Sequence, residues 1–287
     1  MRVLVTGAGG QVGRELVAAF EASGHGVIGA DRRRIDVTDR SAVLQAVATI
    51  RPDAVVHAAA WTEVDACEAD PDRAFRANAL AVRHVAEAAR RAGATVCHIS
   101  TDYVFDGTKP SPYLEWDRPN PRSVYGASKL GGEHELDPGA TLVRTSWVCG
   151  RYGGNVVKTV LRLASEGRQM AFVDDQMGCP TFAGDLAPKI VELVTGHRPG
   201  TFHLTNQGAL SWFEFARAIL DSAGLDPDQV RPVATVDLDP PRPAPRPANS
   251  VLDNAALRMS GLAPLPHYRE SLDRLVRELS EPGSAEW

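Results

Sequence analysis

Short apolar runs alternate with amphipathic stretches from the beginning of the chain. The runs have the length of buried strands, and the stretches between them carry apolar residues at helical spacing. The strand-like runs are 2–6, 26–31, 54–60 and 95–101, and the first helical stretches are 10–23 and 39–50. Strands and helices that alternate in this way form βαβ units. The expected fold class is therefore α/β, a doubly wound parallel (Rossmann) sheet with helices on both faces.

One further helix has a clear beginning and end in the sequence. Asp70 is a suitable N-cap, and Pro71 fits the first helical position. Gly93 follows Arg90 and Arg91, which suit the negative end of a helix. The pattern predicts a single helix from residue 71 to the residue before Gly93.

The second half of the chain is less regular. A proline-rich stretch at 110–121 precedes further alternating elements, and the pattern then loosens. The expected helices are 123–136, 155–166, 185–194 and 212–222, and the expected strands are 141–147, 170–173 and 201–204. We expect a dinucleotide-binding domain over 1–147, to which later segments return, and a smaller α/β region over 148–287 that mainly binds substrate.

Residues 239–247 contain five prolines and cannot form a helix or a central strand, because proline lacks the backbone donor and fixes φ. The segment is interpreted as a linker, as a PxxP-type ligand for a partner, or as a loop over the site. It precedes a final pair of helices, and the sequence leaves these three interpretations open.

Composition narrows the class of protein. The chain has 287 residues, 44% of them hydrophobic, and a net charge of −5, so it offers no positive surplus for nucleic acid or an anionic membrane. The four cysteines are far apart, with no zinc-ligand spacing, and are expected to be reduced. No apolar run has the length of a membrane span, and no leader peptide is recognised. The expected location is the cytoplasm.

The first strand is followed by a glycine-rich turn, Thr6-Gly-Ala-Gly-Gly-Gln-Val-Gly13, and then by a helix. Glycines at 7, 10 and 13 allow a tight turn and let the backbone approach a pyrophosphate at the positive end of that helix. The spacing alone is a weak signal, but the change from strand to helix is the context that the motif requires. We interpret it as a dinucleotide site rather than a plain glycine turn.

The end of the second predicted strand carries conflicting signals about the cofactor. Asp31 is placed to hydrogen-bond the ribose 2′-hydroxyl of NAD, whereas Arg32, Arg33 and Arg34 suit the 2′-phosphate of NADP. A solvated charge run is the alternative. We favour NADPH, with NADH tolerated.

Tyr125 and Lys129 are four residues apart, so they share one face of a predicted helix. With five tyrosines and four lysines in the chain, this spacing is expected by chance only about 0.07 times. A positive charge beside a phenol favours its ionisation, so this pair suits proton transfer to a carbonyl oxygen. Thr101 ends the fourth strand and is placed to donate a hydrogen bond to the same oxygen. A surface pair and a local cap are the alternatives.

Together these motifs resemble the extended short-chain dehydrogenase/reductases, and nearly the whole chain is similar to one branch, the dTDP-4-dehydrorhamnose reductase family. The most specific segments are Ser100-Thr-Asp-Tyr-Val-Phe-Asp-Gly107 and Arg144-Thr-Ser-Trp-Val148. Further matching segments are 10–16, 58–65, 124–129 and 175–181.

The resemblance implies the last step of dTDP-rhamnose synthesis, a step toward cell-wall polysaccharide. NADPH would reduce C4 of dTDP-4-dehydro-6-deoxy-L-mannose, with Tyr125 as proton donor, Lys129 on the nicotinamide ribose and Thr101 on the ketone. The expected cofactor contacts are Gly7, Gly10, Gln11, Val12, Gly13, Asp31, Arg32, Asp36, Val37, Ala60, Trp61, Thr62, Tyr125 and Lys129, with Asn78 nearby. The expected substrate contacts are Thr101, Asp102, Trp147, Asn155, Lys158, Gln176 and Arg246.

Several alternatives remain open at this point. A sugar-nucleotide epimerase, a dehydratase and a non-catalytic regulatory module share the fold, although Asp102-Tyr103 supplies only one of the two carboxylates typical of a dehydratase. Some relatives hold Mg²⁺ between subunits, and Glu15 fits one such position. We expect no catalytic metal, read His57, His98 and His203 as satisfied core residues, and leave open whether the protein is a monomer or a homodimer.

Overall fold

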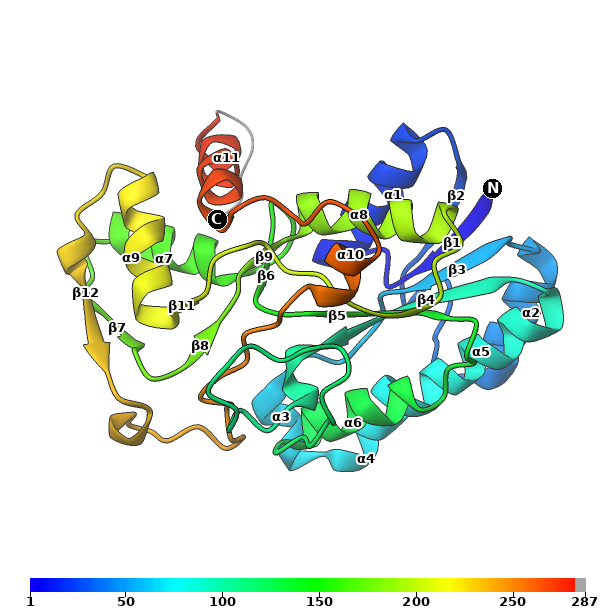
Figure 1. Ribbon diagram of the computed structural model, residues 1–287, viewed down its shortest axis with the longest axis horizontal. Helices are drawn as coiled ribbons and strands as arrows, with labels where there is room; N and C mark the ends of the chain where they lie inside the picture. Colours follow the sequence, from blue (N-terminus) through cyan, green and yellow to red (C-terminus); the bar gives the residue numbers. More distant parts are fainter. Residues whose placement is uncertain (282–287) are drawn as a thin grey trace.

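A six-stranded parallel sheet forms the centre of the larger lobe in the computed structural model, which describes residues 1–281 (Figure 1). Its strands follow the order β10-β5-β4-β3-β1-β2. They are β1 (Arg2–Thr6), β2 (Gly26–Ala30), β3 (Ala54–His57), β4 (Thr95–Thr101), β5 (Thr141–Thr145) and β10 (Gly200–His203). All five pairings are parallel. The predicted doubly wound α/β class is confirmed.

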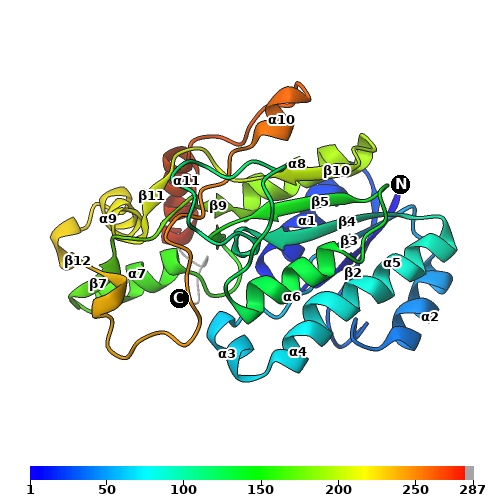
Figure 2. The same ribbon diagram turned by 60° about the horizontal axis from the view of Figure 1, so that its bottom comes forward.

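Helices cover both faces of this sheet (Figure 2). One face carries α1 (Gln11–Ala22) and α8 (Ala183–Thr195), and the other carries α2 (Arg40–Ile50), α5 (Ala81–Ala92) and α6 (Val124–Glu133). Neighbouring residues of a strand point to opposite faces. Val3 and Val5 accordingly pack with Phe20 of α1, whereas Leu4 packs with Val43 of α2. Each face buries its own apolar cluster, and the sheet is buried on both sides.

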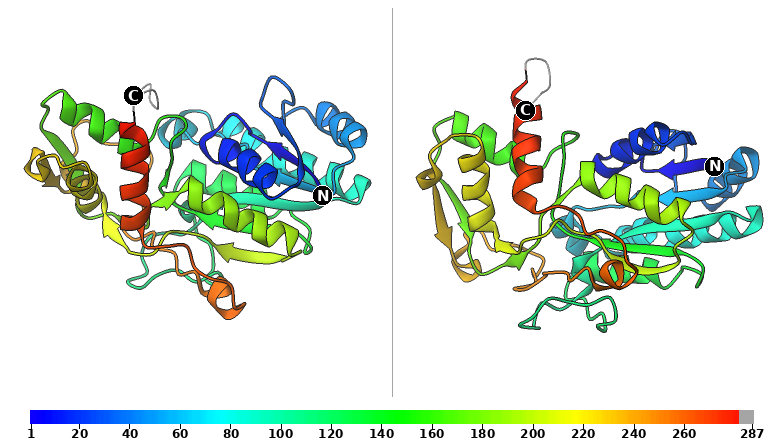
Figure 3. Two further views of the ribbon diagram at one scale, coloured as in Figure 1. Left: turned by 90° about the horizontal axis from the view of Figure 1, so that it is seen from above. Right: turned by 45° about the horizontal axis from the view of Figure 1, so that its top comes forward.

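The smaller lobe has a separate core, visible beside the sheet in Figure 3. It is built from α7 (Val156–Ser165), α9 (Trp212–Ser222) and α11 (Tyr268–Ser280) together with β7 (Met170–Val173) and β12 (Val230–Val233). Its remaining short strands are β6 (Val148–Cys149), β8 (Met177–Gly178), β9 (Thr181–Phe182) and β11 (Leu210–Ser211). The sheet and the smaller lobe therefore have distinct hydrophobic clusters.

The chain returns to the sheet after first entering the smaller lobe. Helix α8 packs against α1, and β10 pairs with β5, so residues 183–203 belong with the first lobe in space. Segment 148–182 and most of 210–280 lie in the smaller lobe or along the connection to it, with α10 (Ala255–Met259) over β10. The division at residue 147 therefore does not separate the two lobes as continuous stretches of chain. It stays a prediction about binding, in which 1–147 mainly binds the cofactor and 148–287 mainly binds substrate.

Three local predictions need correction. The helix expected from residue 71 is α4 (Pro71–Phe75), a π-helical turn (Arg76–Leu80) and α5, because a wider turn is inserted around the buried Asn78. A helix that was not anticipated, α3 (Val64–Ala69), precedes it. Strands β3 and β5 end earlier than expected, and Trp147, just beyond β5, adopts a left-handed φ of 47°.

The proline-rich segment 239–247 crosses from the smaller lobe toward α3 (Figure 1). Arg246 forms a two-pronged ion pair with Asp65 of α3 at 2.5 and 2.8 Å, and the Ala244 N–H donates to the same carboxylate at 3.1 Å. The segment is therefore a strap that ties the lobes together, and its free-linker interpretation is wrong. Within residues 1–281, no helix is long and apolar enough to cross a membrane.

Candidate active site

Two adjoining cavities lie at the carboxyl ends of the central strands. The first, of about 410 Å³, follows β1, β2 and β3, and the second, of about 340 Å³, follows β4 and β5. Ala58 and Ala60 line both of them. The strand order changes direction between β1 and β3, and ligands of open α/β sheets bind at such a switch point. The two cavities thus form one cleft, here called the cofactor cavity and the reaction cavity.

The glycine turn is shaped by close backbone contacts. Gly7 has a φ of 71°, and a Cβ there would lie 2.6 Å from the Ala59 backbone nitrogen. A Cβ on Gly13 would collide with the Gly7 carbonyl oxygen. Gly7 and Gly10 line the cofactor cavity, and Val12 lines the reaction cavity. Side chains larger than hydrogen are excluded at 7 and 13, so the turn brings the backbone itself to the cleft.

Helix α1 begins at this turn without any capping side chain. Its N-cap is Gly10, and its first turn contains no acidic residue. By contrast, Asp39 caps α2 and Ser123 caps α6 through side-chain oxygens. The unsatisfied N–H groups and the positive end of the α1 dipole are therefore available to an anionic ligand at the cleft. The site fits the diphosphate of a dinucleotide.

The two carboxylates after β2 accept hydrogen bonds from their own turns. Asp31 Oδ1 accepts hydrogen bonds from the backbone N–H groups of Arg33 and Arg34, both at 3.1 Å, and Asp31 does not line the cofactor cavity. Asp36 lines the cavity but accepts from the Thr38 N–H and hydroxyl, and these hydrogen bonds lower the pKa of its carboxyl. In Asp31 these hydrogen bonds engage Oδ1 alone, whereas in Asp36 they engage Oδ1 while Oδ2 faces Arg32 at 3.6 Å.

Arginines supply the positive charge of the cofactor cavity, although Arg32 lies 3.6 Å from Asp36 Oδ2. Arg32 lines it, as expected, and so do Arg73 and Arg76, which the sequence analysis did not single out. The guanidinium of Arg73 lies 4.1 Å from the centre of the Trp61 ring, which also lines the cavity. Three guanidinium groups around one cavity suit phosphate groups.

Asn78 holds the loop after β3. Its Oδ1 accepts from the Trp61 N–H at 2.8 Å, while its Nδ2 donates to the Trp61 carbonyl at 3.0 Å and to Ser128 at 3.0 Å. The expected position of Asn78 beside the cofactor residues is observed, and its role is to fix the backbone of Trp61. The π-helical turn places this side chain, so an irregular helix serves the site.

Thr101, Tyr125 and Lys129 lie around the reaction cavity, as the motifs predicted. Thr101 ends β4, and the other two lie on the buried face of α6. The Tyr125 ring packs edge-on against Tyr103, with 5.6 Å between centroids. Asp102, Thr62 and Trp147 line the same cavity. Tyr125, Thr101 and Lys129 thus bring a phenol, a hydroxyl and an ammonium to one cavity, which adjoins the cofactor cavity at Ala58 and Ala60.

The electrostatics of Tyr125 differ from the expectation. Burial raises the pKa of this phenol, and the Thr101 hydroxyl lowers it only in part. The expected effect of Lys129, which was to favour ionisation of Tyr125, does not outweigh burial. The phenol is therefore protonated at neutral pH and ready to donate.

The Lys129 ammonium is buried against β4. Its Nζ donates to the Ile99 carbonyl at 2.7 Å and lies 3.4 Å from His98 Nε2. Burial lowers the pKa of Lys129 to about 8, and Glu133 acts in the opposite direction. Lys129 is thus charged at neutral pH but close to losing its proton in mild alkali.

Asp102, like Lys129, is a buried ionisable group beside the reaction cavity. The Thr101 hydroxyl donates to its Oδ1 at 2.9 Å, and its Oδ2 has no hydrogen-bond partner within residues 1–281. Burial raises the pKa of Asp102 to about 6, although the Ser250 and Thr101 side chains lower it. An unpaired buried carboxylate oxygen at a cavity is suited to bind a hydroxyl group of a ligand.

Trp147 forms the wall toward the smaller lobe. Its ring stacks on Trp212 with 3.7 Å between centroids, and both rings line the reaction cavity. A Cβ on Gly178 would lie 2.5 Å from the Trp147 ring. Packing from two sides therefore fixes the ring, and the residue both fills the lobe junction and borders the cavity.

The remaining expected substrate contacts are engaged inside the protein. Asn155 caps α7 and donates to Gln11 at 3.0 Å, while Gln11 donates to the Gly154 carbonyl at 3.2 Å. Lys158 Nζ donates to the Arg151 carbonyl at 2.7 Å. Gln176 donates to Thr235 at 2.8 Å. These side chains, like Arg246 in the strap, are absent from the lining of both cavities.

The structure offers little to a metal ion. Among residues 1–281, no group of three or more His, Cys, Asp or Glu side chains is arranged to hold one. Glu15 forms an ion pair with Arg151 at 3.5 Å, and burial raises the pKa of Glu15. Its nearest charged partner is thus a cation of the same chain.

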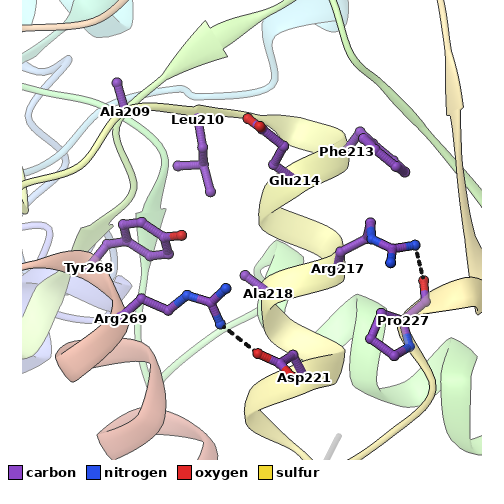
Figure 4. A pocket seen from close by; sticks show the side chains of 10 residues that line it. All are labelled: Ala209, Leu210, Phe213, Glu214, Arg217, Ala218, Asp221, Pro227, Tyr268 and Arg269. Carbon is purple, nitrogen blue, oxygen red and sulfur yellow. Dashed lines mark hydrogen bonds and ion pairs between the residues drawn. The ribbon is translucent and has the colours of Figure 1, made fainter.

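A larger pocket of about 500 Å³ lies away from this cleft, between α9 and α11 (Figure 4). Arg269 pairs with Asp221 at 3.0 Å, and Arg217 donates to the Pro227 carbonyl at 3.1 Å and to Asp228 at 3.0 Å. The arginines are neutralised by nearby carboxylates. This pocket shares no lining residue with either cavity of the cleft.

Comparison with known proteins gives a consistent result. Residues 1–281 match the family model described as the RmlD substrate binding domain. The chain is 40% identical to the spore coat polysaccharide biosynthesis protein SpsK of Bacillus subtilis, with 97% of this chain and 98% of that protein covered. It is 41% identical to the dTDP-4-dehydrorhamnose reductase of Streptomyces griseus, with 94% and 91% covered.

The fold is also similar to a crystal structure of dTDP-4-dehydrorhamnose reductase from Bacillus anthracis in complex with NADP. The TM-score is 0.92 at 39% sequence identity, and the alignment covers 96% of this chain and 99% of that one.

Proposed function

The chain belongs to the family described as the RmlD substrate binding domain, and on that premise we propose that it is an NADPH-dependent reductase of a dTDP-linked 4-keto-6-deoxy sugar. The substrate is dTDP-4-dehydro-6-deoxy-L-mannose, and the product is dTDP-L-rhamnose. The observation that carries the proposal is the meeting of Thr101, Tyr125 and Lys129 in one cavity that opens into an arginine-lined cofactor cavity.

The cofactor cavity supports NADPH in preference to NADH. The uncapped start of α1 would hold the diphosphate, and Arg32, which forms only a loose ion pair of 3.6 Å with Asp36, would hold the 2′-phosphate. Asp31 Oδ1 accepts two hydrogen bonds from its own turn, and Asp31 does not line the cofactor cavity. When bound, NADPH supplies the hydride that is added to C4 of the ketone.

The chain's own residues handle the proton. The protonated Tyr125 phenol donates to the oxygen of the former ketone, and Thr101 donates a hydrogen bond that stabilises charge on that oxygen. Burial favours the neutral phenol, so Tyr125 is in the protonation state that reduction requires. Lys129 binds the ribose next to the nicotinamide, and Asp102 accepts a hydrogen bond from a sugar hydroxyl.

The decisive experiment is a cofactor-oxidation assay with purified protein and several 4-ketosugars. We expect loss of NADPH absorbance with dTDP-4-dehydro-6-deoxy-L-mannose, and turnover at least tenfold slower with the UDP- or GDP-linked counterparts. Conversion without net NADPH loss would instead indicate an epimerase. Absence of turnover with every ketosugar, in protein that binds NADPH, would overturn the reductase assignment.

We also propose that the enzyme acts in the cytoplasm. All four cysteines, Cys67, Cys97, Cys149 and Cys179, are buried free thiols. Free thiols are typical of proteins in a reducing compartment.

A further inference from the structure

A row of polar side chains crosses three adjacent strands beneath the reaction cavity. Thr6 of β1 pairs in register with His57 of β3, and His57 pairs in register with His98 of β4. Thr6 Oγ1 lies 2.7 Å from His57 Nδ1, and the two imidazoles stack with 5.2 Å between centroids. His98 Nε2 then lies 3.4 Å from Lys129 Nζ. We call these three residues, Thr6, His57 and His98, the polar row.

The polar row does not touch either cavity. His57 and His98 are 0% exposed and Thr6 is 2% exposed, and none of the three lines the cleft. His57 Nε2, His98 Nδ1 and His203 Nε2 have no hydrogen-bond partner within the described residues, so the expectation of satisfied core histidines is wrong for one nitrogen of each ring. Burying imidazoles in this way costs more than burying aliphatic side chains. Because His98 lies against Lys129, the buried imidazoles point to a role at the site.

Both imidazoles are neutral. Burial lowers the pKa of His57 to about 3 and that of His98 well below its usual value, and the Lys129 charge acts in the same direction. A neutral imidazole has one donating and one accepting nitrogen. The ammonium of Lys129 can only donate, so His98 Nε2 is the acceptor of this pair and the ring proton is on Nδ1.

An ammonium group has three N–H donors. The Ile99 carbonyl accepts one at 2.7 Å, His98 faces a second, and Lys129 also lines the reaction cavity. Resting on the reductase function proposed above, we propose that His98 is a positioning residue for Lys129. Together with Ile99 it fixes two donors of the ammonium so that the third points toward the bound cofactor ribose.

The effect of His98 on the pKa of Lys129 can be distinguished from the effects of the other ionisable groups nearby. Glu133 of α6 favours the ammonium, but Arg144 of β5 holds that carboxylate through contacts at 2.7 and 3.0 Å. The histidines near Lys129 on β4 and β3, which are His98 and His57, are both neutral. Loss of the His98 acceptor is therefore expected to lower the pKa of Lys129 further below about 8.

The test is direct binding of NADPH as a function of pH, without sugar substrate, in wild type and three variants. His98→Leu removes the acceptor, and His98→Gln keeps an oxygen at the distance of Nε2. The matched control is His203→Leu, which removes another buried neutral histidine. Its Nδ1 lies 3.1 Å from the Tyr113 and Asp253 carbonyls, and it makes no hydrogen bond to Lys129 within residues 1–281. Thermal unfolding checks that each variant is folded.

We expect His98→Leu to weaken NADPH binding about tenfold at pH 7.5 and to move the alkaline loss of binding about one pH unit lower. His98→Gln is expected to restore both values to within about threefold and 0.3 pH unit of wild type. His203→Leu lowers the unfolding temperature but leaves the pH profile unchanged. If His98→Leu does not fold, His98→Asn replaces it, because Asn cannot reach Lys129.

Two results would overturn the inference: a folded His98→Leu or His98→Asn protein with the wild-type pH profile, or an equal shift in His203→Leu. Failure of the proposed function would give a different result. The wild-type protein would then bind NADPH but reduce no ketosugar, and the binding comparison would still test the role of His98.

Discussion

The cofactor cavity and the reaction cavity recognise their ligands by opposite means. In the cofactor cavity the polar groups are accessible: the first turn of α1 has no cap, and Arg32, Arg73 and Arg76 line an open space. In the reaction cavity the polar groups are buried, and burial has shifted the pKa of Tyr125, Lys129 and Asp102. One cavity offers ready donors to an anion, and the other holds groups whose environment sets their protonation.

This difference shows where binding and chemistry are separated. Accessible donors gain affinity from any phosphate, and that affinity is sensitive to salt. Buried groups have already lost their hydration before the substrate binds, so they interact more strongly with charge that develops during the reaction. Changes in the cofactor cavity should therefore alter cofactor binding, whereas changes in the reaction cavity should alter turnover and pH dependence.

The largest expected effect is in the reaction cavity. Tyr125→Phe removes the proton donor and should lower kcat by about 10²–10⁴-fold, the usual range for acid catalysis. NADPH affinity should change less than threefold, because the ring and its packing on Tyr103 remain. Stopped assays and direct cofactor binding measure the two quantities. Unaltered turnover would refute the role of Tyr125, and a large loss of NADPH binding would contradict the separation of the two cavities.

Asp102→Asn should stabilise the ligand-free protein at pH 7 by about 3 kcal/mol. Burial raises the pKa of this carboxyl from 3.8 to about 6, so its protonated form is favoured in the folded state. The resulting stability is full below about pH 4 and is lost as the pH rises through 6. Urea unfolding at pH 4 and pH 7 should show the difference between the two proteins only at pH 7.

Asp106→Asn provides a control of opposite sign. Hydrogen bonds from Asn120, Thr108 and Tyr113 lower the pKa of the Asp106 carboxyl, so its ionised form contributes stability at neutral pH that is lost as the pH falls. This substitution should destabilise the protein at pH 7. Equal effects of the two substitutions at pH 7 would show that burial does not set the charge state of Asp102.

In the cofactor cavity, Arg32→Ala should raise the Kd of NADPH about 10–30-fold while changing that of NADH less than twofold. The guanidinium interacts with the 2′-phosphate, which NADH lacks. Arg33→Ala is the matched control, since Arg33 is the next residue in the same charged run and does not line the cavity. Isothermal titration with both cofactors gives the ratio, and equal losses for NADPH and NADH would place Arg32 on a shared part of the cofactor.

The smallest expected effect concerns Asn155, which joins the glycine turn to α7. Asn155→Ala removes the N-cap of α7 and should lower the free energy of unfolding by about 1 kcal/mol. The KM for the sugar should change less than threefold, because the side chain bonds Gln11 and the Gly150 carbonyl instead of lining the reaction cavity. A tenfold rise in KM at unchanged stability would restore Asn155 as a substrate contact.

Much of the cofactor half could be predicted because its determinants are local. The glycine turn, the end of β2 and the Tyr125–Lys129 spacing are each encoded within a few residues, and strand-to-helix alternation places them at one sheet edge. The sequence motifs were therefore sufficient to identify Gly7, Gly10 and Arg32 as residues of one cavity.

The parts that could not be predicted depend on distant contacts. Arg246 is polar and suits a diphosphate, but only the fold shows that Asp65, far away in sequence, already holds it. Likewise, the pKa of Tyr125 depends on how completely other elements bury it, which a spacing of four residues does not reveal. Arg73 and Arg76 were missed because a π-helical turn interrupts the predicted helix, and its only sequence signal is Asn78 between small residues.

That wider turn makes the length of the segment a determinant of which side chains reach the cofactor cavity. Each α-helical residue rotates the chain by about 100°. Deleting one residue from Arg76–Leu80 would therefore let a regular helix form. It would also rotate the preceding residues about the helix axis relative to α5. Arg73 would leave the Trp61 ring although no contacting side chain had been replaced. In this protein a change of register, as well as a change of residue type, offers a route to a differently lined cofactor cavity.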